Sequence, residues 1–258
     1  MIKYITDTDL DLVKELHEDY YGRKILSYYY SYGTGYDFCR FYEAGSEDTN
    51  TKAYIVHFNS IMIIWSDGPL ESEELITFIR MHSPFRVEAP WMVLKELCEI
   101  PGYKMLKRTK FEFTDHRPDD FDETQVITDP SLDEIYEILH EGFPTLISHG
   151  LWITEHSHKI RRGLSKIYLY RHCTTATVIY DVDDHVLIGQ VATRAEARGR
   201  GYARELLYWI GHTLASEGKK VSLFALDYRE SFYKEIGFKA VSTENVIQVD
   251  TNGGPNDQ

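Results

Sequence analysis

The stretch "EARGRGYARELLYWI", residues 196–210, decides the fold. From Ala203 onward the apolar side chains recur at a spacing that predicts an amphipathic helix, at Leu206, Leu207, Ile210 and Leu214. Directly before this helix, residues 198–201 read Arg-Gly-Arg-Gly. Glycines let backbone N–H groups approach a ligand closely, and arginines add positive charge beside the positive end of a helix. The stretch therefore predicts an anion-binding site at a helix N-terminus.

Three familiar phosphate-binding patterns do not fit this loop. The GxxxxGK[ST] string of a Walker A loop is absent from the sequence. The dinucleotide pattern GxGxxG matches at Gly199 and Gly201, but its third glycine is replaced by Arg204. An RG-rich nucleic-acid segment would be repeated within a basic chain, whereas this chain has a net charge of −13.

Composition narrows the class of protein. The 258 residues are 43% hydrophobic, enough for one large domain or two ordinary ones. The negative charge disfavours nucleic-acid partners and would attract a cationic substrate. Three widely spaced cysteines indicate a reducing compartment without structural zinc. Since the N-terminus is too acidic for a signal peptide and no apolar run could span a membrane, we expect a cytoplasmic protein.

Both halves of the chain predict the same order of α+β elements. In the C-terminal half we expect a helix at 129–143, capped by Asp129 with Pro130 in its first turn, and a second helix at 151–164. Strands at 166–173, 175–182 and 185–193 precede the loop and its helix, and a strand at 219–226, a helix at 230–237 and a strand at 240–249 follow. In the N-terminal half the strands are expected at 37–44, 52–58, 61–66, 85–90 and 105–113, with helices at 71–79 and 92–103.

Two short matches support a tandem repeat. Residues 73–79 align with 204–210 at an offset of 131, since 205 − 74 = 131. Residues 97–104 align with 232–239 at an offset of 135, since 237 − 102 = 135. We therefore predict two copies of one α+β fold, at 1–115 and 129–250, joined by a linker at 116–128 and followed by a flexible tail at 251–258. The aromatic run at 28–43 is expected to pack in a core or between the domains.

The loop resembles that of a known enzyme family. Its string matches the pattern (Q/R)-x-x-G-x-(G/A) of the GNAT superfamily, the CoA-dependent N-acetyltransferases, over Arg198, Gly199, Arg200, Gly201, Tyr202 and Ala203. A strand precedes it, and the later string "SFYKEIGF", residues 231–238, resembles the second CoA-contacting segment of the family. The resemblance implies a GNAT-like fold duplicated in tandem, with a mixed central sheet flanked by helices. The second copy is intact over 129–249, and the first is degenerate.

The resemblance also implies a reaction, in which acetyl passes from acetyl-CoA to a primary amine by direct attack. Residues 198–203 would hold the pyrophosphate without a metal, and the strand residues Val191, Ala192 and Thr193 would pair with the pantetheine arm. A backbone N–H there would face the thioester carbonyl. Tyr233 would protonate the departing thiolate, since a thiol has a pKa of about 8.5 and a tyrosine about 10.

The sequence departs from the family pattern at the general base. Many members carry a glutamate on the strand before the loop, but residues 185–193 contain no carboxylate. A water chain, His185, Gln190 or the aspartates at 181, 183 and 184 could serve instead. Three histidines lack the spacing of a zinc site and are expected to face solvent or line the acceptor site, at positions His149, His156 and His158.

Several alternatives stay open at this point. Another acyl donor or a hydroxyl acceptor would suit the same residues, as would a non-catalytic CoA-binding scaffold. In the N-terminal half, Asp67 stands where the loop has Arg198, since 198 − 131 = 67, and Cys98 falls opposite Tyr233. We therefore expect that half to have lost CoA binding. The sequence leaves the acceptor and the oligomeric state open.

Overall fold

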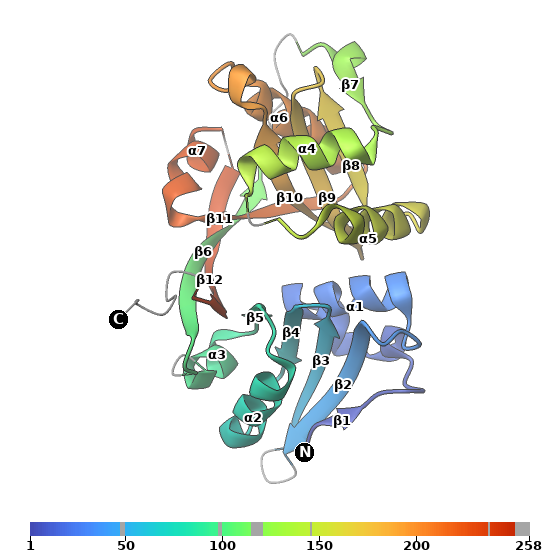
Figure 1. Ribbon diagram of the computed structural model, residues 1–258, viewed down its shortest axis with the longest axis vertical. Helices are drawn as coiled ribbons and strands as arrows, with labels where there is room; N and C mark the ends of the chain where they lie inside the picture. Colours follow the sequence, from blue (N-terminus) through green and yellow to red (C-terminus); the bar gives the residue numbers. More distant parts are fainter. Residues whose placement is uncertain (47–49, 98–99, 115–120, 145, 237, 251–258) are drawn as a thin grey trace, which may run out of the picture. The chain divides into compact units, whose positions relative to one another are not determined.

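The computed structural model describes residues 1–46, 50–97, 100–114, 121–144, 146–236 and 238–250. The chain divides into two compact units. Unit 1 comprises Met1–Arg108 and Thr243–Gln258, and unit 2 comprises Thr109–Ser242. Each unit is an α+β structure with a mixed sheet (Figure 1).

Unit 2 contains the loop that the sequence singles out. Its elements are η3 (Glu123–Gln125), β7 (Val126–Ile127), α4 (Leu132–Gly142), α5 (His149–Arg161), β8 (Lys166–Tyr170), β9 (Thr174–Val182), β10 (His185–Thr193), η4 (Ala195–Ala197), α6 (Tyr202–Ser216), β11 (Lys220–Leu226), η5 (Asp227–Arg229), α7 (Glu230–Glu235) and the start of β12 (Phe238–Val249). The sheet order is β12-β6-β11-β10-β9-β8-β7. Strands β7 to β10 pair antiparallel, whereas β10 and β11 are parallel.

Helices cover both faces of the unit 2 sheet, because alternate residues of each strand point to opposite sides. On one face α6 buries Leu206 and Ile210 against Ala176 and Ile188. On the other face α4 and α5 pack against the sheet, with Trp152, Ile138, Leu169 and Ala192 in one apolar cluster (Figure 1). The helix spacing read from the sequence thus marks the buried stripe of α6.

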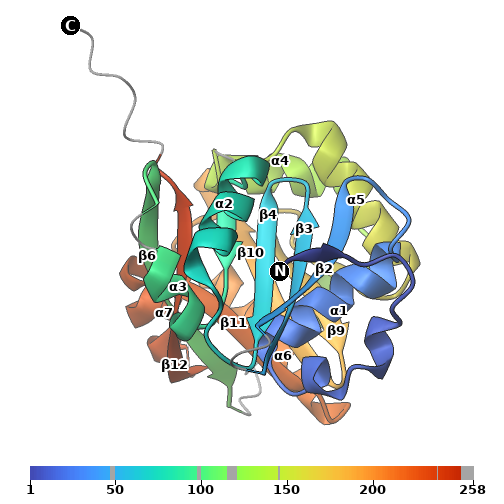
Figure 2. The same cartoon turned by 90° about the horizontal axis from the view of Figure 1, so that it is seen from below.

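The elements of unit 1 follow a similar order, but a single α-helix precedes its second strand where unit 2 has two. They are β1 (Lys3–Tyr4), η1 (Leu10–Leu12), η2 (Lys14–His17), α1 (Tyr20–Tyr32), β2 (Cys39–Ser46), β3 (Thr51–Phe58), β4 (Ile61–Ser66), α2 (Ser72–His82), β5 (Arg86–Glu88), α3 (Trp91–Leu97) and β6 (Tyr103–Phe113). Helix α1 packs on β3 and β4, and α2 and α3 share a second apolar cluster with Ile55 and Ile64 (Figure 2). Strands β4 and β5 are parallel, as β10 and β11 are in unit 2.

The two longest strands, β6 and β12, each belong to both units. Strand β6 leaves unit 1 after Arg108, and β12 enters unit 1 at Thr243, where Val246 and Ile247 pair with β5. Each half of the chain therefore contributes the end of its last strand to the other compact unit, so the units do not coincide with 1–115 and 129–250. The shared element order fits a tandem duplication, which stays a prediction. The expected tail at 251–258 and residues 115–120 of the expected linker lie outside the described residues.

Most predicted elements are present, and β10 spans the predicted residues 185–193. The predicted cap of the first C-terminal-half helix is wrong, because α4 begins at Leu132 and Ser131, not Asp129, is its N-cap. Helix α1 was not predicted. Tyrosine is a weaker helix former than leucine or alanine, so its six tyrosines obscure the helical pattern. Tertiary packing compensates, since Tyr28 and Tyr32 are buried against Phe58.

An ionic cluster lies buried within unit 1. The Glu88 carboxylate, only 2% exposed, accepts hydrogen bonds from Lys24 Nζ, Arg108 Nη2 and the Tyr20 hydroxyl, each at 2.8 Å. Burial opposes the charge of Glu88, but Arg108, Lys24 and Arg86 together hold its pKa well below the usual range. The cluster joins α1, β5 and the unit 1 part of β6.

Replacing Glu88 by glutamine should lower the free energy of unfolding by about 3–5 kcal/mol, because two cations would stay buried without their counter-ion. Urea denaturation followed by circular dichroism measures the loss. The matched control is Glu96→Gln, which removes an exposed carboxylate 3.6 Å from Lys95 in the same unit and should cost less than about 1 kcal/mol. Equal stabilities of the two variants would contradict a structural role for the cluster.

Candidate functional site

The loop before α6 has the backbone of an anion cradle. Gly199 and Gly201 adopt φ values of +78° and +84°, a region that side-chain-bearing residues avoid. Gly201 is the N-cap of α6 and carries no side chain that could bond the first-turn N–H groups. These donors stay available to an anion that approaches along the helix axis. The predicted residues 198–203 therefore lie together at one helix end.

Arginines surround this helix end. Arg198 and Arg200 are exposed, and Arg198 Nε donates to the carbonyl of Thr193 at 3.0 Å, which links the loop to the end of β10. The guanidinium of Arg171, in the loop between β8 and β9, lies 5.4 Å from the ring centre of Tyr202. Positive charge thus comes from two separate loops.

Strand β10 separates from its parallel neighbour just before the loop. Its pairing with β11 stops at Ile188 and Leu223, although both strands continue, to Thr193 and Leu226. The pairing with β9 is interrupted between Gly189 and Ala192, and Gln190 has a φ of +50°. Such a bulge bends a strand and changes the direction of its side chains.

Of the three predicted strand residues, Val191 lies in this bulge and Ala192 and Thr193 lie just beyond it. Ala192 is buried against α4 and α5, whereas Val191 packs toward the α6 side of the sheet. The hydroxyls of Thr193 and Thr174 lie 3.0 Å apart across the β9–β10 pair. Within the described part of the chain, no strand pairs with the edge of this segment that faces β11, so its backbone groups could pair with an extended ligand.

Tyr233, the predicted general acid, lies on α7 in the α6-side core. Its ring is half-buried and packs edge-on against Phe232 and Phe238 and at a tilt on Phe111, with ring centres 5.2–6.1 Å apart. Burial raises the pKa of Tyr233 to about 12, and Arg229 partly opposes this effect. The hydroxyl therefore keeps its proton through neutral and moderately alkaline pH. Gly237, which ends the motif, lies outside the described residues.

The candidate bases differ in their distance from the bulge and the loop that follow along β10. His185 and the aspartates at 183 and 184 lie at the start of β10, about 25 Å along the strand from the loop. Asp181 is engaged by the ammonium of Lys219 at the same end. Gln190, in contrast, lies in the bulge itself. His185 is five residues before Gln190, about 16 Å along the extended strand, so this group is also separated from the bulge.

The three histidines of α5 have different environments. His149 is exposed and lies 2.7 Å from a carboxylate oxygen of Asp133. His158 is half-buried. His156 is 5% exposed, stacks on Trp152 at 4.0 Å, and its Nδ1 lies 2.9 Å from the Trp152 carbonyl. Sequence spacing alone could not separate these residues, because only the packing of α5 on the sheet buries the middle one.

Solved structures share this architecture over nearly the whole chain. A Drosophila protein matches 98% of this chain and 99% of its own length, with a TM-score of 0.65 at 12% identity. A GCN5-related N-acetyltransferase from Sphaerobacter thermophilus matches 96% and 94%, with a TM-score of 0.60 at 17% identity. A GCN5-related N-acetyltransferase-like protein from Streptococcus suis matches 93% and 98%, with a TM-score of 0.57 at 13% identity.

The chain has the GNAT fold. The likeness in structure confirms the fold that the loop motif predicts. No protein-family model matches the sequence, and no curated protein is similar enough to count as a relative. At these identities the likeness establishes the GNAT fold alone, so the chemistry rests on the residues of this chain.

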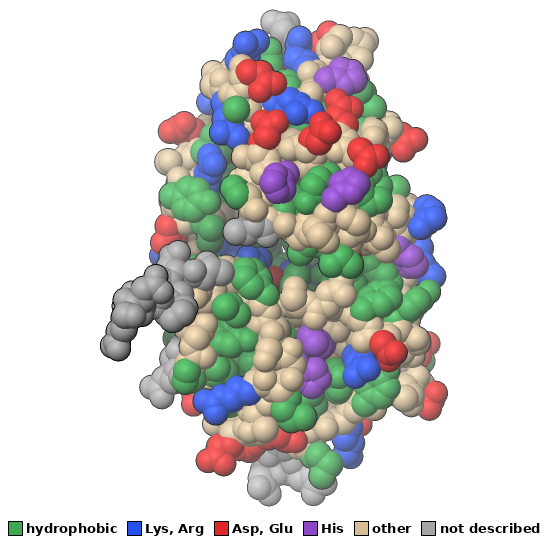
Figure 3. All heavy atoms as spheres, in the orientation of Figure 1, with side chains coloured by type: hydrophobic (Ala, Val, Ile, Leu, Met, Phe, Trp, Pro, Cys, Tyr) green, Lys and Arg blue, Asp and Glu red, His purple; other side chains and the backbone are tan. Residues whose placement is uncertain are grey.

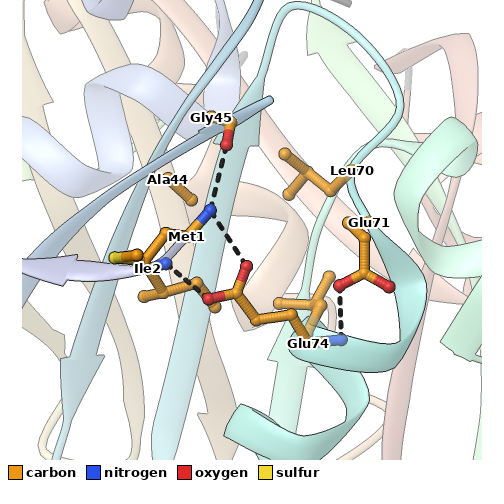
Figure 4. A pocket seen from close by; sticks show the side chains of 8 residues that line it. Met1, Ile2, Ala44, Gly45, Leu70, Glu71 and Glu74 are labelled. Atoms are coloured by element: carbon orange, nitrogen blue, oxygen red, sulfur yellow. Dashed lines mark hydrogen bonds and ion pairs between the residues drawn. The ribbon is translucent and has the colours of Figure 1, made fainter. Parts of the chain in front are cut away.

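In unit 1, the N-terminus of α2, which the predicted repeat aligns with that of α6, is capped by a side chain. Glu71 is the N-cap of α2, and its carboxylate accepts hydrogen bonds from the N–H groups of Glu73 and Glu74 at 3.0 and 2.7 Å. The Glu74 carboxylate accepts a further bond from the N–H of Ile2 (Figure 4). The helix end that binds an anion in the predicted site of unit 2 is thus already occupied by a carboxylate here.

The described residues show neither a metal cluster nor a membrane-spanning helix. No three His, Cys, Asp or Glu side chains in this part of the chain are arranged to hold a metal ion. Within the same residues, no helix has both the length and the apolar character needed to cross a membrane.

Proposed function

We propose that this GNAT-fold protein is an N-acetyltransferase that transfers acetyl from acetyl-CoA to a primary amine. The observation that carries the proposal is the adjacency of two features of unit 2. The parallel strands β10 and β11 part after Ile188, and β10 then leads directly into a helix N-terminus without a capping side chain. An extended thioester arm that ends in a pyrophosphate matches both features.

Each predicted residue then has a role in the reaction. The loop N–H groups and Arg200 hold the pyrophosphate, and the free edge of residues 191–193 pairs with the pantetheine arm. A backbone N–H near the bulge polarises the thioester carbonyl. The amine nitrogen attacks this carbon, the C–S bond breaks, and Tyr233 gives its proton to the thiolate. Solvent returns a proton to the tyrosine.

Charge favours a cationic acceptor. The protein has a net charge of −13, which attracts amines in their protonated form. Acidic side chains gather over α4 in unit 2, with basic ones among them (Figure 3). Helix α4 contributes Glu141, which pairs with Arg194 at 2.9 Å just after the end of β10. The acidic face is thus continuous with the end of β10 that would hold the pantetheine arm.

The direct test is release of free thiol from acetyl-CoA in the presence of a panel of primary amines. Activity with an amine, and none with the corresponding alcohol, supports the proposal. Turnover only with longer acyl-CoA donors, or only with alcohols, would instead indicate an acyltransferase with another donor or a hydroxyl acceptor. Binding of acetyl-CoA without turnover of any acceptor would indicate a CoA-binding scaffold, which the missing strand carboxylate keeps as the second candidate.

Titration calorimetry should find one CoA site in each chain. The N-terminus of α6 in unit 2 has no capping side chain, whereas the Glu71 carboxylate accepts hydrogen bonds from the first-turn N–H groups of α2 in unit 1. A second anion there would face the negative charge of the Glu71 carboxylate and repulsion from Glu74. Two equivalent sites per chain would contradict the assignment of unit 1 as a copy without CoA binding.

A further inference from the structure

A group of unpaired polar atoms lies beneath the bulge of β10, on the face covered by α5. Among the residues that the structure describes, four side-chain atoms here are buried without a hydrogen-bond partner: Trp152 Nε1, Thr175 Oγ1, Thr177 Oγ1 and Gln190 Oε1. Buried polar atoms in native proteins are nearly always satisfied by protein or water, so several together need an explanation. A polar ligand group or bound water would satisfy them.

The sheet register brings these atoms together. Thr177 pairs with Gly189, and Thr175 pairs with Ala192, so Gln190 lies between the two threonines on the neighbouring strand. Their even spacing in β9 places both threonines on the side opposite Ala176 and Val178, which belong to the α6-side core. Trp152 shares the α5-side cluster with Ala192, and its ring stacks on His156.

His156 is an ionisable residue beside this polar group, since its ring stacks on that of Trp152. Its Nδ1 lies 2.9 Å from the Trp152 carbonyl, which can only accept, so Nδ1 carries a proton and Nε2 keeps its lone pair when the ring is neutral. Burial lowers the pKa of His156. The imidazole is therefore neutral at pH 7 and can act as a base, a role for which strand β10 has no carboxylate.

Charged neighbours of His156 come from its own helix. Glu155 raises its pKa and Lys159 lowers it, and the Gln190 side chain also favours the charged form. Glu155 and Lys159 form an ion pair at 2.9 Å, and their effects on the pKa of His156 oppose each other. From α4, Tyr136 reaches the Trp152 ring and His140 lies beside Tyr136. Strands β9 and β10 present the uncharged Thr175, Thr177 and Gln190.

We propose that His156 accepts the proton that the acceptor amine loses, through water held by Gln190 and the two threonines under the bulge. This inference rests on the proposed acetyltransferase function. When the lone pair of the amine nitrogen forms the N–C bond, that nitrogen loses a proton, which passes through the water to His156 Nε2. The C–S electron pair leaves with sulfur, and the imidazolium afterwards returns its proton to solvent. His156 acts through water and is a positioning and proton-accepting residue.

The test compares two amines that differ in basicity, n-propylamine and methoxyamine, with acetyl-CoA and the variant His156→Gln. Methoxyamine is already unprotonated at neutral pH and needs less help from a base. For n-propylamine, kcat/KM should fall about 10²–10⁴-fold in the variant, the usual contribution of a positioned base. For methoxyamine the loss should be less than about tenfold. The matched control is His158→Gln, on the same helix, which should keep wild-type rates.

The pH profile supplies a readout that a structural role would not move. After division by the fraction of n-propylamine that is unprotonated, kcat/KM should still show an acid limb in the wild type, on the acid side of the usual histidine range because burial lowers the pKa of His156, and this limb should vanish in His156→Gln. A second variant, Gln190→Met, should keep this limb but move it to lower pH, because the amide favours the charged imidazole. Equal losses with both amines, or an unchanged acid limb, would overturn the inference.

The melting-temperature shift caused by acetyl-CoA separates this inference from the proposed function. His156→Gln should keep the wild-type shift, since the loop before α6 is intact. A lost shift in this variant means that the site has collapsed and overturns the assigned role. If the wild type turns over neither amine, the proposed function itself fails, and the inference fails with it.

Discussion

Acetyl-CoA should no longer raise the melting temperature of the variant Gly201→Glu. The new carboxylate would lie at the N-cap of α6, where it can bond the first-turn N–H groups and repel a pyrophosphate. Glu71 already does this at the start of α2 in unit 1. In the wild type, ligand at 100 times its Kd adds about 2.7 kcal/mol to stability, a shift that thermal unfolding resolves easily.

The control for Gly201→Glu is Gly218→Glu. Gly218 follows the other end of α6 and has the same φ of +84°, so both variants carry a similar backbone strain. A Cβ at Gly218 would meet no atom within 4 Å, and one at Gly201 would meet only Glu205 Oε1 at 3.7 Å. Both variants should melt below the wild type by similar amounts, but only Gly218→Glu should keep the acetyl-CoA shift. If Gly201→Glu keeps it as well, the loop does not bind CoA.

The variant Tyr233→Phe should lower kcat about 10²–10⁴-fold while the affinity for acetyl-CoA barely changes. Phenylalanine keeps the ring that packs against Phe111, Phe232 and Phe238 and removes only the hydroxyl. An acid that protonates the leaving thiolate acts in the transition state, so its loss appears in kcat. Because its pKa is raised to about 12, Tyr233 stays protonated at moderately alkaline pH. The wild-type kcat should therefore not fall in this pH range through loss of the Tyr233 proton.

Single-turnover rates and acetyl-CoA titration separate the two effects in Tyr233→Phe. The control is Tyr228→Phe, which removes a hydroxyl from a tyrosine that is 73% exposed in η5, five residues earlier, and should keep the wild-type kcat. A Tyr233→Phe enzyme with a kcat near that of the wild type would return Tyr233 to a packing role. Water would then be the proton donor to the thiolate.

Local patterns were enough to predict much of unit 2. The apolar spacing of α6, the two glycines before it and the strand at 185–193 are contiguous features, and each depends mainly on nearby residues. Their order in the sequence also places the loop at the end of β10. The GNAT resemblance rests on these features, and the structural likeness over nearly the whole chain confirms the fold.

Other features depend on contacts between distant segments. Helix α1 has a tyrosine-rich sequence that predicts little, and it is stabilised by packing against strands 20 or more residues away. The boundary between the compact units could not be predicted either. It follows from the exchange of the ends of β6 and β12, which depends on strand pairing and leaves no local signal in the sequence.

By itself the sequence determined an α+β chain with a glycine- and arginine-rich loop at Arg198–Ala203 that leads into a helix, since backbone conformation and helix ends follow from short-range residue choice. Only the tertiary structure decided which of the histidines lies close to the bulge of β10. His185 and the aspartates beside it are close to the loop in the sequence but lie at the far end of an extended strand. His156 is more than 30 residues from Gln190 in the chain, yet the packing of α5 on the sheet buries it beneath the bulge. Extended strands separate neighbours in sequence, and helix-on-sheet packing brings distant residues together.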